Sequence, residues 1–424
     1  MDVGSSSVRA VAYDENGHAE PGNARLPYAE LGADELVGAC RAVLQQVGEG
    51  DALAISAYWH SLVALDGANR PLGPVLTWRD TLGEPPRLDA DDYHRRTGCF
   101  LHPAFWPAKL VRLERDGLRP ARFVSFADYL LLQLTGELRT TVSMAAGTGL
   151  FDPNRLDWDD ETLEAVGVRR EQLPPLGGEP AAGVFPALGD GACSNAGVGA
   201  LRRRRAALTI GTSGAVRVVY PAENAEARPG LFLYRLDEHR FCEGGALSDG
   251  GNLHAWLVQT LQEVDTTQLA ERPAAAHGLV FLPFLGGERS LGWNPDRRGA
   301  VQGLSFATTP LDLVQAALEG VCYRFAAVLD AIGGVESIVT TGGALVANPG
   351  WVQMLADVLG RPLEVSAATE GSARGAALVA LERLGFPISP APIARTVEPR
   401  ADRFAIHQHA RAVHEAQIHI EEET

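Results

Sequence analysis

The sequence has no long apolar run, no paired cysteines and no excess of positive charge. No window approaches the roughly 18 uninterrupted apolar residues of a membrane-spanning helix, and no basic segment followed by an apolar one marks a secretory signal. The five cysteines are widely spaced and contain no C-x-x-C pair, which argues against a disulfide framework and a zinc site. These features are typical of a cytoplasmic protein whose cysteines are reduced thiols in the core.

The charge balance disfavours two classes of partner. Lys and Arg number 37 against 53 Asp and Glu, so the formal net charge of −16 repels phosphate backbones and anionic lipid. Nucleic acid and membranes are therefore poor partners. At about 100–200 residues per domain, a chain of 424 residues is expected to form two large domains or three small ones, each with its own core.

An internal repeat divides the chain into two halves. The segment from Asp2 to Tyr13 aligns with the segment from Thr209 to Tyr220 without a gap. In each copy a cluster of Gly, Ser and Thr precedes an apolar run with β-branched residues, which predicts a tight turn leading into a strand. One copy opens each half, so we expect domains at 1–201 and 202–424.

Strands and helices are expected to alternate in both halves. In the first half, Asn16-Gly17 is suited to a hairpin turn, a helix is expected over 34–47 and a strand over 52–58. In the second half the pattern predicts strands over 241–246, 278–284 and 338–341, and helices over 253–261, 309–332 and 349–359. This alternation favours two α/β layers with a cleft between them.

The two small-residue clusters are candidate phosphate-binding turns. The clusters Gly4-Ser5-Ser6-Ser7 and Gly211-Thr212-Ser213-Gly214 each offer consecutive backbone amides where small side chains allow close approach. Singly, each is more often a plain turn, but a matched pair could clamp one polyphosphate. Neither fits the P-loop or the dinucleotide fingerprint, so those enzyme classes are disfavoured.

Asp190 is the candidate catalytic group. Glycines on both sides, in Gly189-Asp190-Gly191, leave its carboxylate uncovered at the expected start of a short helix. Phosphoryl transfer to an alcohol needs a base near the attacking hydroxyl, and a carboxylate in a closed cleft can take that proton. The alternative is that Asp190 satisfies the amides at the start of the helix.

Three further groups have both a functional and a structural interpretation. Asp2 precedes the first turn, from which a carboxylate can hold Mg²⁺ through water or simply cap the turn. The glycines of Thr341-Gly342-Gly343-Ala344 could let adenine lie against the backbone, or they could be plain turn residues. Aromatic and polar residues combine in Tyr58-Trp59-His60-Ser61 and Thr77-Trp78-Arg79-Asp80, as sugar sites require, although they could equally be core packing.

Taken in order, these motifs resemble the FGGY carbohydrate kinases, a branch of the actin and hexokinase superfamily, over nearly the whole chain. Further similarity lies in Phe281 to Arg289, in Asp296-Arg297-Arg298-Gly299, and in Gly342-Gly343-Ala344 followed by Trp351 to Asp357. Within the family, the runs His60 to Asp66 and Ile210 to Arg217 are most similar to gluconate kinases, with pentulose kinases next.

The resemblance implies an α/β fold of two actin-like (ribonuclease H-like) domains with a central cleft, and it implies roles for particular residues. Asp190 would be the catalytic base and also contact substrate, and Asp2 would hold Mg²⁺. The residues implied for the phosphates of ATP are Gly4, Ser5, Ser6, Ser7, Arg9, Gly211, Thr212 and Ser213. Those implied for adenosine are Gly299, Gly343, Ala344 and Asn348, and those for substrate are His60, Trp78, Asp80 and Arg289. Lys109 could meet a substrate carboxylate, but we expect it to be structural.

The implied activity is ATP-dependent phosphorylation of a sugar or sugar acid, first of all D-gluconate. The alternatives are a pentulose kinase, similar to xylulose or ribulose kinases, or a kinase of another polyol. A candidate of another class is an actin-like sensor that closes on nucleotide without transferring phosphate; such a protein has no need of Asp190. The assembly is left open between a monomer and a homodimer.

The sequence departs from the family pattern at three places. It opens directly at Asp2, where family members have several apolar residues first, so the first central strand is expected to be short. The stretch Ser290 to Trp293 lacks the usual Ala-Pro, and the loop from Ala344 to Trp351 is slightly longer than usual.

Overall fold

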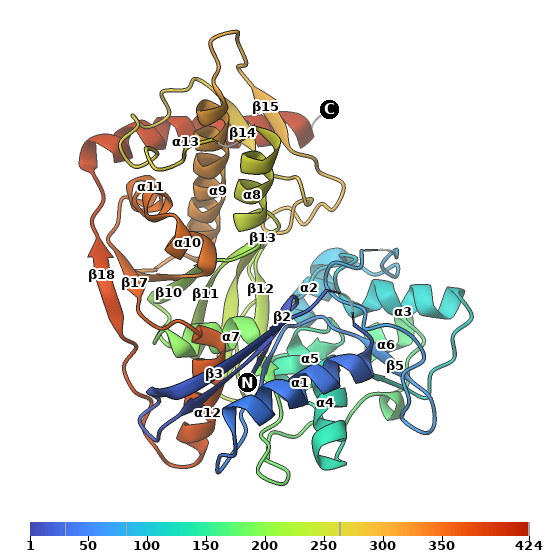
Figure 1. The fold of residues 1–424 in the computed structure, drawn as a ribbon. Helices are drawn as coiled ribbons and strands as arrows, with labels where there is room; N and C mark the ends of the chain where they lie inside the picture. The colour runs from blue at the N-terminus through green and yellow to red at the C-terminus, as the bar shows by residue number, and fades with distance from the viewer. Residues whose placement is uncertain (30, 82, 263, 423–424) are drawn as a thin grey trace.

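The structure is a computed structural model that describes residues 1–29, 31–81, 83–262 and 264–422. Figure 1 shows two lobes, each containing strands and helices. The first central sheet has five strands, in the spatial order β3 (Ala19–Pro27), β2 (Ser7–Tyr13), β1 (Asp2–Val3), β4 (Ser56–Ala57) and β9 (Leu188–Gly189).

The second central sheet is larger. Its seven strands lie in the order β12 (Phe232–Arg235), β13 (Arg240–Leu247), β11 (Gly214–Pro221), β10 (Arg205–Ile210), β16 (Ser337–Thr341), β17 (Leu363–Ser366) and β18 (Ile393–Val397).

The two sheets repeat one topology. β1 is antiparallel to β2 and parallel to β4, and β10 is likewise antiparallel to β11 and parallel to β16. The order β3-β2-β1-β4-β9 therefore matches β13-β11-β10-β16-β17. The sequence repeat falls on equivalent strands of the two sheets, and the expected pair of actin-like α/β domains is confirmed.

The first central strand is short, as expected, and this limits its neighbour. β1 pairs with β4 only through Asp2 with Ser56 and Val3 with Ala57. The strand expected over 52–58 was therefore predicted too long, because only Ser56 and Ala57 pair with β1.

Local sequence explains the hairpin and the first helix. The β2–β3 hairpin turns at Gly17, which has a φ of +71°, and the carboxylate of Asp14 accepts bonds from the amides of Asn16 and His18. Helix α1 (Ala33–Val47) confirms the helix expected over 34–47. It buries Leu36, Val37, Cys40 and Val43, which recur at helical spacing on one face.

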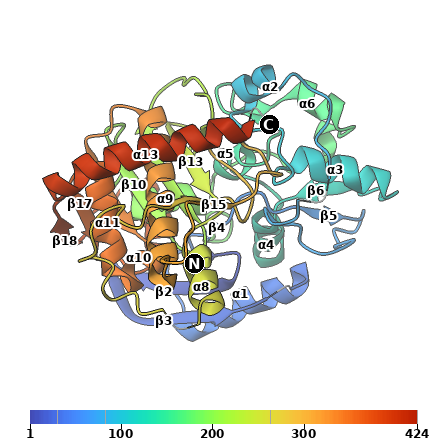
Figure 2. The same cartoon turned by 90° about the horizontal axis from the view of Figure 1, so that it is seen from above.

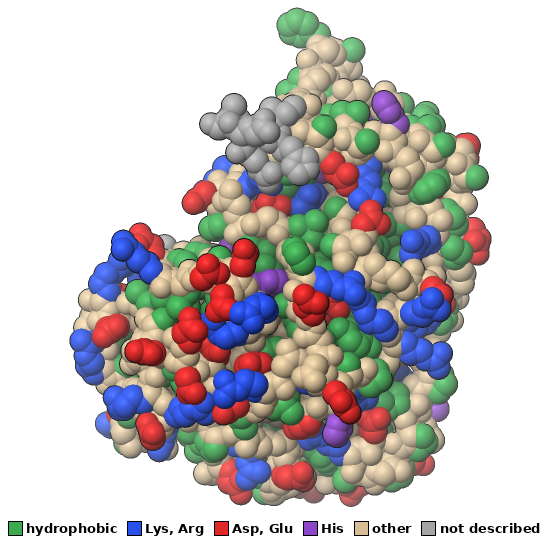
Figure 3. Space-filling view, turned by 180° about the vertical axis from the view of Figure 1, so that it is seen from behind, with side chains coloured by type: hydrophobic (Ala, Val, Ile, Leu, Met, Phe, Trp, Pro, Cys, Tyr) green, Lys and Arg blue, Asp and Glu red, His purple; other side chains and the backbone are tan. Residues whose placement is uncertain are grey.

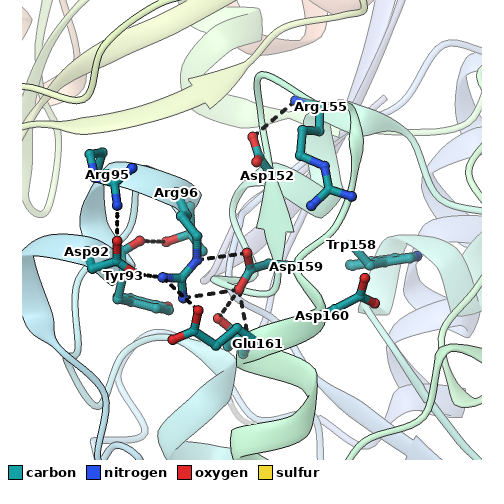
Figure 4. Close-up of polar contacts among 12 residues, drawn as sticks. Asp92, Tyr93, Arg95, Arg96, Asp152, Arg155, Trp158, Asp159, Asp160 and Glu161 are labelled. Atoms are coloured by element: carbon teal, nitrogen blue, oxygen red, sulfur yellow. Dashed lines mark hydrogen bonds and ion pairs between the residues drawn. The ribbon is translucent and has the colours of Figure 1, made fainter.

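A long insertion between β4 and β9 forms the rest of the first lobe. Its elements are β5 (Val63–Leu65), α2 (Ala90–Thr97), α3 (Trp106–Arg115), β6 (Arg122–Val124), α4 (Phe126–Thr135), α5 (Val142–Ala146), β7 (Phe151–Asp152), β8 (Asp157–Trp158) and α6 (Asp160–Ala165). Figure 4 shows Arg96 of α2 tied to Asp92, Asp159 and Glu161, with 3.0 Å between Arg96 Nε and Asp159 Oδ2. These ion pairs join α2 to the start of α6.

The helices predicted in the second half are present. Its remaining elements are α7 (Asp190–Gly197) at the junction, α8 (Gly251–Thr260), β14 (Val280–Leu282), β15 (Ala300–Gln302), α9 (Pro310–Ile332), α10 (Gly343–Ala347), α11 (Pro349–Leu359), α12 (Gly371–Arg383) and α13 (Ala401–Glu422). Figures 1 and 2 show α13 lying across the end of this lobe, where it packs on α9, α11 and β14. None of the helices described combines the length and apolar character that a bilayer crossing requires.

The larger hydrophobic core is shared by the two halves. It contains residues of the first half together with Ala215, Val219, Phe232, Tyr234 and Cys242 of the second. A second core lies within the second half and includes Val216 and Val218 of the same strand β11. β11 thus packs one face on each core, which differs from the expectation of separate cores. All five cysteines are buried free thiols, as predicted.

The surface carries both charges. On the face shown in Figure 3, acidic and basic side chains are interspersed over the lower part of the molecule. The net negative charge is therefore not gathered into one patch on that face.

Candidate active site

A cavity of about 290 Å³ lies between the two halves, at the ends of β1 and β10. Most of the predicted site residues line it: Asp2, Gly4, Ser5, Ser6, Ser7, Arg9, His60, Trp78, Asp190, Gly211, Thr212, Ser213 and Arg289.

The first turn leaves backbone amides available. Between β1 and β2 the Gly4 amide donates to Ser7 O at 3.0 Å, and the hydroxyl of Tyr28 donates to Gly4 O. The amides of Ser5 and Ser6 donate to no acceptor within the described ranges. Two adjacent free amides in a fixed turn form a nest suited to phosphate oxygens.

The second turn repeats this arrangement and is braced from behind. Between β10 and β11 the Gly211 amide donates to Ser213 O at 2.9 Å, while the amides of Thr212 and Ser213 have no acceptor in the part of the chain described. The start of α8 supports the turn, since the amides of Gly251 and Asn252 donate to Gly211 O and Thr212 O, each at 2.9 Å.

Asp2 stands beside the first turn and is linked to the other half of the molecule. Its Oδ1 accepts a bond from Ser56 Oγ at 2.8 Å, and its Oδ2 lies 3.9 Å from Arg9 Nη1. Arg9 is also paired with Glu370, at the start of α12, at 3.1 Å. Burial raises the pKa of Asp2, while Ser56 and Arg9 lower it.

Asp190 opens α7, directly after β9. Its Oδ1 accepts a bond from the amide of Gly191 at 2.7 Å, so it satisfies one helix amide, but the N-cap position belongs to Gly189. The neighbouring glycines do more than leave the carboxylate uncovered. A Cβ on Gly189 would lie 1.9 Å from Trp59 Cε2, and one on Gly191 would lie 2.6 Å from Arg217 Nε. Glycine is therefore needed for Trp59 and Arg217 to pack against the backbone beside Asp190.

Burial raises the pKa of Asp190 to about 6, and the nearby charge of Arg217 opposes this shift. The group is therefore ionised at neutral pH and has a higher proton affinity than an exposed carboxylate. Both properties suit a general base.

His60 lines the cavity in an unusual backbone conformation. Its φ is +68°, in the left-handed region that non-glycine residues rarely adopt. Lys109 Nζ donates to His60 O at 2.9 Å and to Ala104 O at 2.8 Å, and the His60 ring Nδ1 lies 2.6 Å from Gly147 O. Lys109 therefore has a structural contact, as expected. Burial, together with Arg289 and Lys109, holds the pKa of His60 well below its usual value.

Trp78 and Arg289 face the cavity together, whereas Asp80 does not. The Arg289 guanidinium lies 5.7 Å from the ring centre of Trp78. The carboxylate of Asp80 is engaged in its own turn, where it accepts bonds from the Thr77 amide at 2.6 Å and from Thr77 Oγ1 at 2.9 Å.

The residues predicted for adenosine also lie outside the cavity. Asn348 caps α11 by accepting a bond from the Trp351 amide at 3.2 Å, and Gly299 packs beside Leu285. Gly343 and Ala344 are nearer, because a Cβ on Gly251, behind the second turn, would lie 3.0 Å from the Ala344 Cβ. Their roles toward nucleotide stay predictions.

Tyr58, Trp59 and Gly214, which belong to the predicted motifs, also line the cavity. Seven cavity residues were not predicted as site residues: Thr209, Ala215, Arg217, Phe232, Tyr234, Ala246 and Ser372. Arg217 could have been found from alternation, since it lies two residues after Ala215 on the same face of β11. Phe232 and Tyr234 belong to no motif. Ser372 enters from α12, where its hydroxyl donates to Asp190 O at 3.2 Å.

Comparison with known proteins identifies two matching family models. The N-terminal domain of the FGGY family of carbohydrate kinases matches residues 1–197, and the C-terminal domain of the same family matches residues 206–382.

Similar proteins include kinases of different substrates. The gluconokinase of Bacillus subtilis is 26% identical, over 91% of this chain and 87% of its own length. The xylulose kinase of Escherichia coli is 28% identical, over 97% of this chain and 96% of its own length. Among solved structures, xylulose kinase and gluconate kinase from Lactobacillus acidophilus have TM-scores of 0.87 and 0.85. Both are 25% identical to this chain and cover 98% of it and 96% of their own length.

Proposed function

The chain belongs to the FGGY family of carbohydrate kinases, and we propose that its substrate is D-gluconate, which it converts to 6-phosphogluconate with ATP. One observation carries the proposal: two matching amide-bearing turns and an acidic side chain, Asp190, line one cavity between the two halves. The similarity to gluconokinases supports gluconate as the acceptor.

The two turns are proposed to hold the phosphates of ATP from opposite sides. Free amides at Ser5 and Ser6 and at Thr212 and Ser213 suit a polyanion in a protein whose overall charge repels it. No group of three or more carboxylate, imidazole or thiol ligands occurs among the described residues, so a bound cation would depend on few protein ligands. Asp2 fits Mg²⁺ held mainly by water and phosphate, because Mg²⁺ commonly uses only one or two carboxylates. Bound there, Mg²⁺ would neutralise charge on the transferring phosphate.

Asp190 is proposed to take the proton from the attacking hydroxyl of the sugar. Its carboxylate lines the cavity and is ionised at neutral pH, with Arg217 packed beside it. Closure of the two halves would exclude water, which otherwise competes as acceptor.

The test is a substrate panel with a variant of the base. Protein is incubated with Mg-ATP and D-gluconate, D-xylulose, D-ribulose, glycerol or erythritol, and ADP release is followed. We expect the highest kcat/KM with gluconate. Replacing Asp190 by Asn should lower turnover by about 10²- to 10⁴-fold, the usual contribution of a general base, with nucleotide affinity unchanged.

Each failure has a distinct meaning. Turnover of a pentulose without turnover of gluconate would move the assignment to the pentulose kinases. Turnover near the wild-type value in Asp190→Asn would remove Asp190 from the mechanism. Nucleotide binding without turnover of any acceptor would favour the sensor alternative.

A further inference from the structure

Three arginines that line the cavity, Arg9, Arg217 and Arg289, have a buried Nε without a hydrogen-bond partner among the described residues. Arg9 is paired with Glu370 through its Nη1. Two buried arginines outside the cavity have backbone partners: Arg235 Nε donates to Pro153 O at 2.7 Å, and Arg374 Nη1 donates to Gly197 O at 2.6 Å. A buried donor without an acceptor is costly, so such a nitrogen beside a cavity suits an anionic ligand.

The surroundings of Arg289 fix its position. Its guanidinium lies 5.7 Å from the ring centres of both Trp78 and Trp293. Trp293 is itself held, because its Nε1 donates to Gly230 O at 3.0 Å and its ring stacks on Phe100 at 4.2 Å. Arg289 is therefore ordered before ligand binds, which lowers the entropic cost of using it.

Nearby carboxylates are committed to other contacts. Asp80 is bound to Thr77, and Asp2 is bound to Ser56 on the side of the first turn. Arg217 packs against the backbone at Gly191, which places it at the reacting end beside Asp190. Arg289 lines the cavity beside Trp78, whereas Arg79, on the same ring, does not line it. Arg289 lowers the pKa of His60, His102 and Asp190.

We propose that Arg289 binds the carboxylate of an open-chain sugar acid whose hydroxyl at the far end reaches Asp190. The proposal rests on the proposed function and deepens it, because it assigns the selection of an acid over a neutral sugar to one side chain. An aldonic acid carries both groups that these two side chains suit: a carboxylate for the arginine and an alcohol for the carboxylate base. Guanidinium and carboxylate form charge-assisted, bidentate hydrogen bonds.

The experiment compares Arg289→Gln, Arg289→Lys and wild type with two ligands, D-gluconate and the neutral D-xylulose. Binding of each ligand to nucleotide-free protein is measured by calorimetry, and KM and kcat are measured with Mg-ATP. Arg115→Gln is the matched control, because it removes the same charge from an exposed position on α3, outside the cavity.

In Arg289→Gln we expect the Kd and KM for gluconate to rise about 10- to 100-fold, as the loss of a charged hydrogen bond predicts. The kcat and the affinity for D-xylulose should change much less. Arg289→Lys keeps the charge, so its Kd and KM for gluconate should lie between those of wild type and Arg289→Gln. Arg115→Gln should have the wild-type values.

Equal weakening of gluconate and D-xylulose in Arg289→Gln would overturn the role of Arg289 and leave gluconate phosphorylation by the wild type intact. Wild-type protein that neither binds nor phosphorylates gluconate would overturn the proposed function, and the role of Arg289 with it. If thermal unfolding shows that Arg289→Gln does not fold, the test uses Arg289→Lys, and an unchanged ratio of the Kd for gluconate to the Kd for D-xylulose in that variant would overturn the role of Arg289.

Discussion

At the scale of single residues, Asp190 is governed by two opposing influences. Burial raises the pKa of its carboxyl to about 6, and the adjacent Arg217 lowers it. A base must be deprotonated to act, so the group's activity should be lost as the pH falls through this value. Arg217 therefore influences the acid limb of the reaction without receiving the proton itself.

We expect kcat/KM for the sugar to be nearly constant above pH 7 and to fall about tenfold per pH unit well below 6. Replacing Arg217 by Met removes a charge that lowers the pKa of Asp190, so the midpoint of the acid limb should move to higher pH. Arg217→Lys, which keeps the charge, should stay near wild type. Initial rates from pH 5 to 9 give the midpoint of the acid limb for each variant. An unchanged midpoint in Arg217→Met would show that the charge of Arg217 does not set the pKa of Asp190.

The sequence revealed the site residues that belong to motifs and missed those that only the fold brings in. Asp2, Asp190 and the two turns were predicted because small residues and carboxylates stand out beside strand patterns. Tyr234 and Ser372 could not be, because β12 and α12 reach the cavity only through tertiary packing. Asp80 and Asn348 have typical side chains for a ligand site but are bonded locally, to Thr77 and to α11.

At the scale of elements, the crossing of α7 and α12 decides how the two halves meet. The backbones touch: a Cβ on Gly375 would lie 1.8 Å from Cys193 O, and one on Gly197 would lie 1.9 Å from Gly371 O. α7 begins with Asp190, and α12 begins beside Glu370, the partner of Arg9. The spacing of these two helices therefore sets the position of Asp190 relative to the first turn.

Replacing Gly375 by Ala should force the helices apart and lower the free energy of unfolding by about 1–3 kcal/mol or more, as overpacking does. Turnover should fall as well, because Asp190 moves with α7. Denaturant unfolding and the kinase assay measure the two effects. The control is Gly38→Ala in α1, where nothing lies within 4 Å of the added Cβ; it should stabilise by roughly 0.5–1 kcal/mol. Equal effects of the two substitutions on stability and turnover would contradict the claim that α7 and α12 leave no room for a side chain at Gly375.

The long helices were predictable, while the short strands were not. α1, α9 and α11 follow the helical spacing of apolar residues, and a capping box of Thr309 with Asp312 opens α9. The run over 278–284 was predicted as a buried strand, but its ladder is limited to β14, which pairs with β15. Strand length depends on the partner, and the partner is not encoded in the strand's own residues.

At the scale of the molecule, the two halves share a core although the sequence repeat suggests independence. β11 contributes Ala215 and Val219 to the core that contains the first half, and Val216 and Val218 to the core within the second. Unfolding of the first half alone would expose one apolar face of this strand. The division at residue 201 stays a prediction.

We therefore expect one cooperative unfolding transition, which is unusual for a chain of this size. Far-UV circular dichroism and tryptophan fluorescence should give coincident midpoints, and the calorimetric and van't Hoff enthalpies should agree. Two resolved midpoints would show that the core within the second half is stable without the shared one.

The lysine behind His60 has a practical consequence. Lys109 is the only lysine in the sequence, and it is 2% exposed. Amine-directed reagents therefore find no lysine on the folded surface. The rate at which such a reagent acylates Lys109 would measure how often the structure opens locally behind His60. Coupling of the enzyme to a support through lysines would fail for the same reason, so an attachment point has to be introduced.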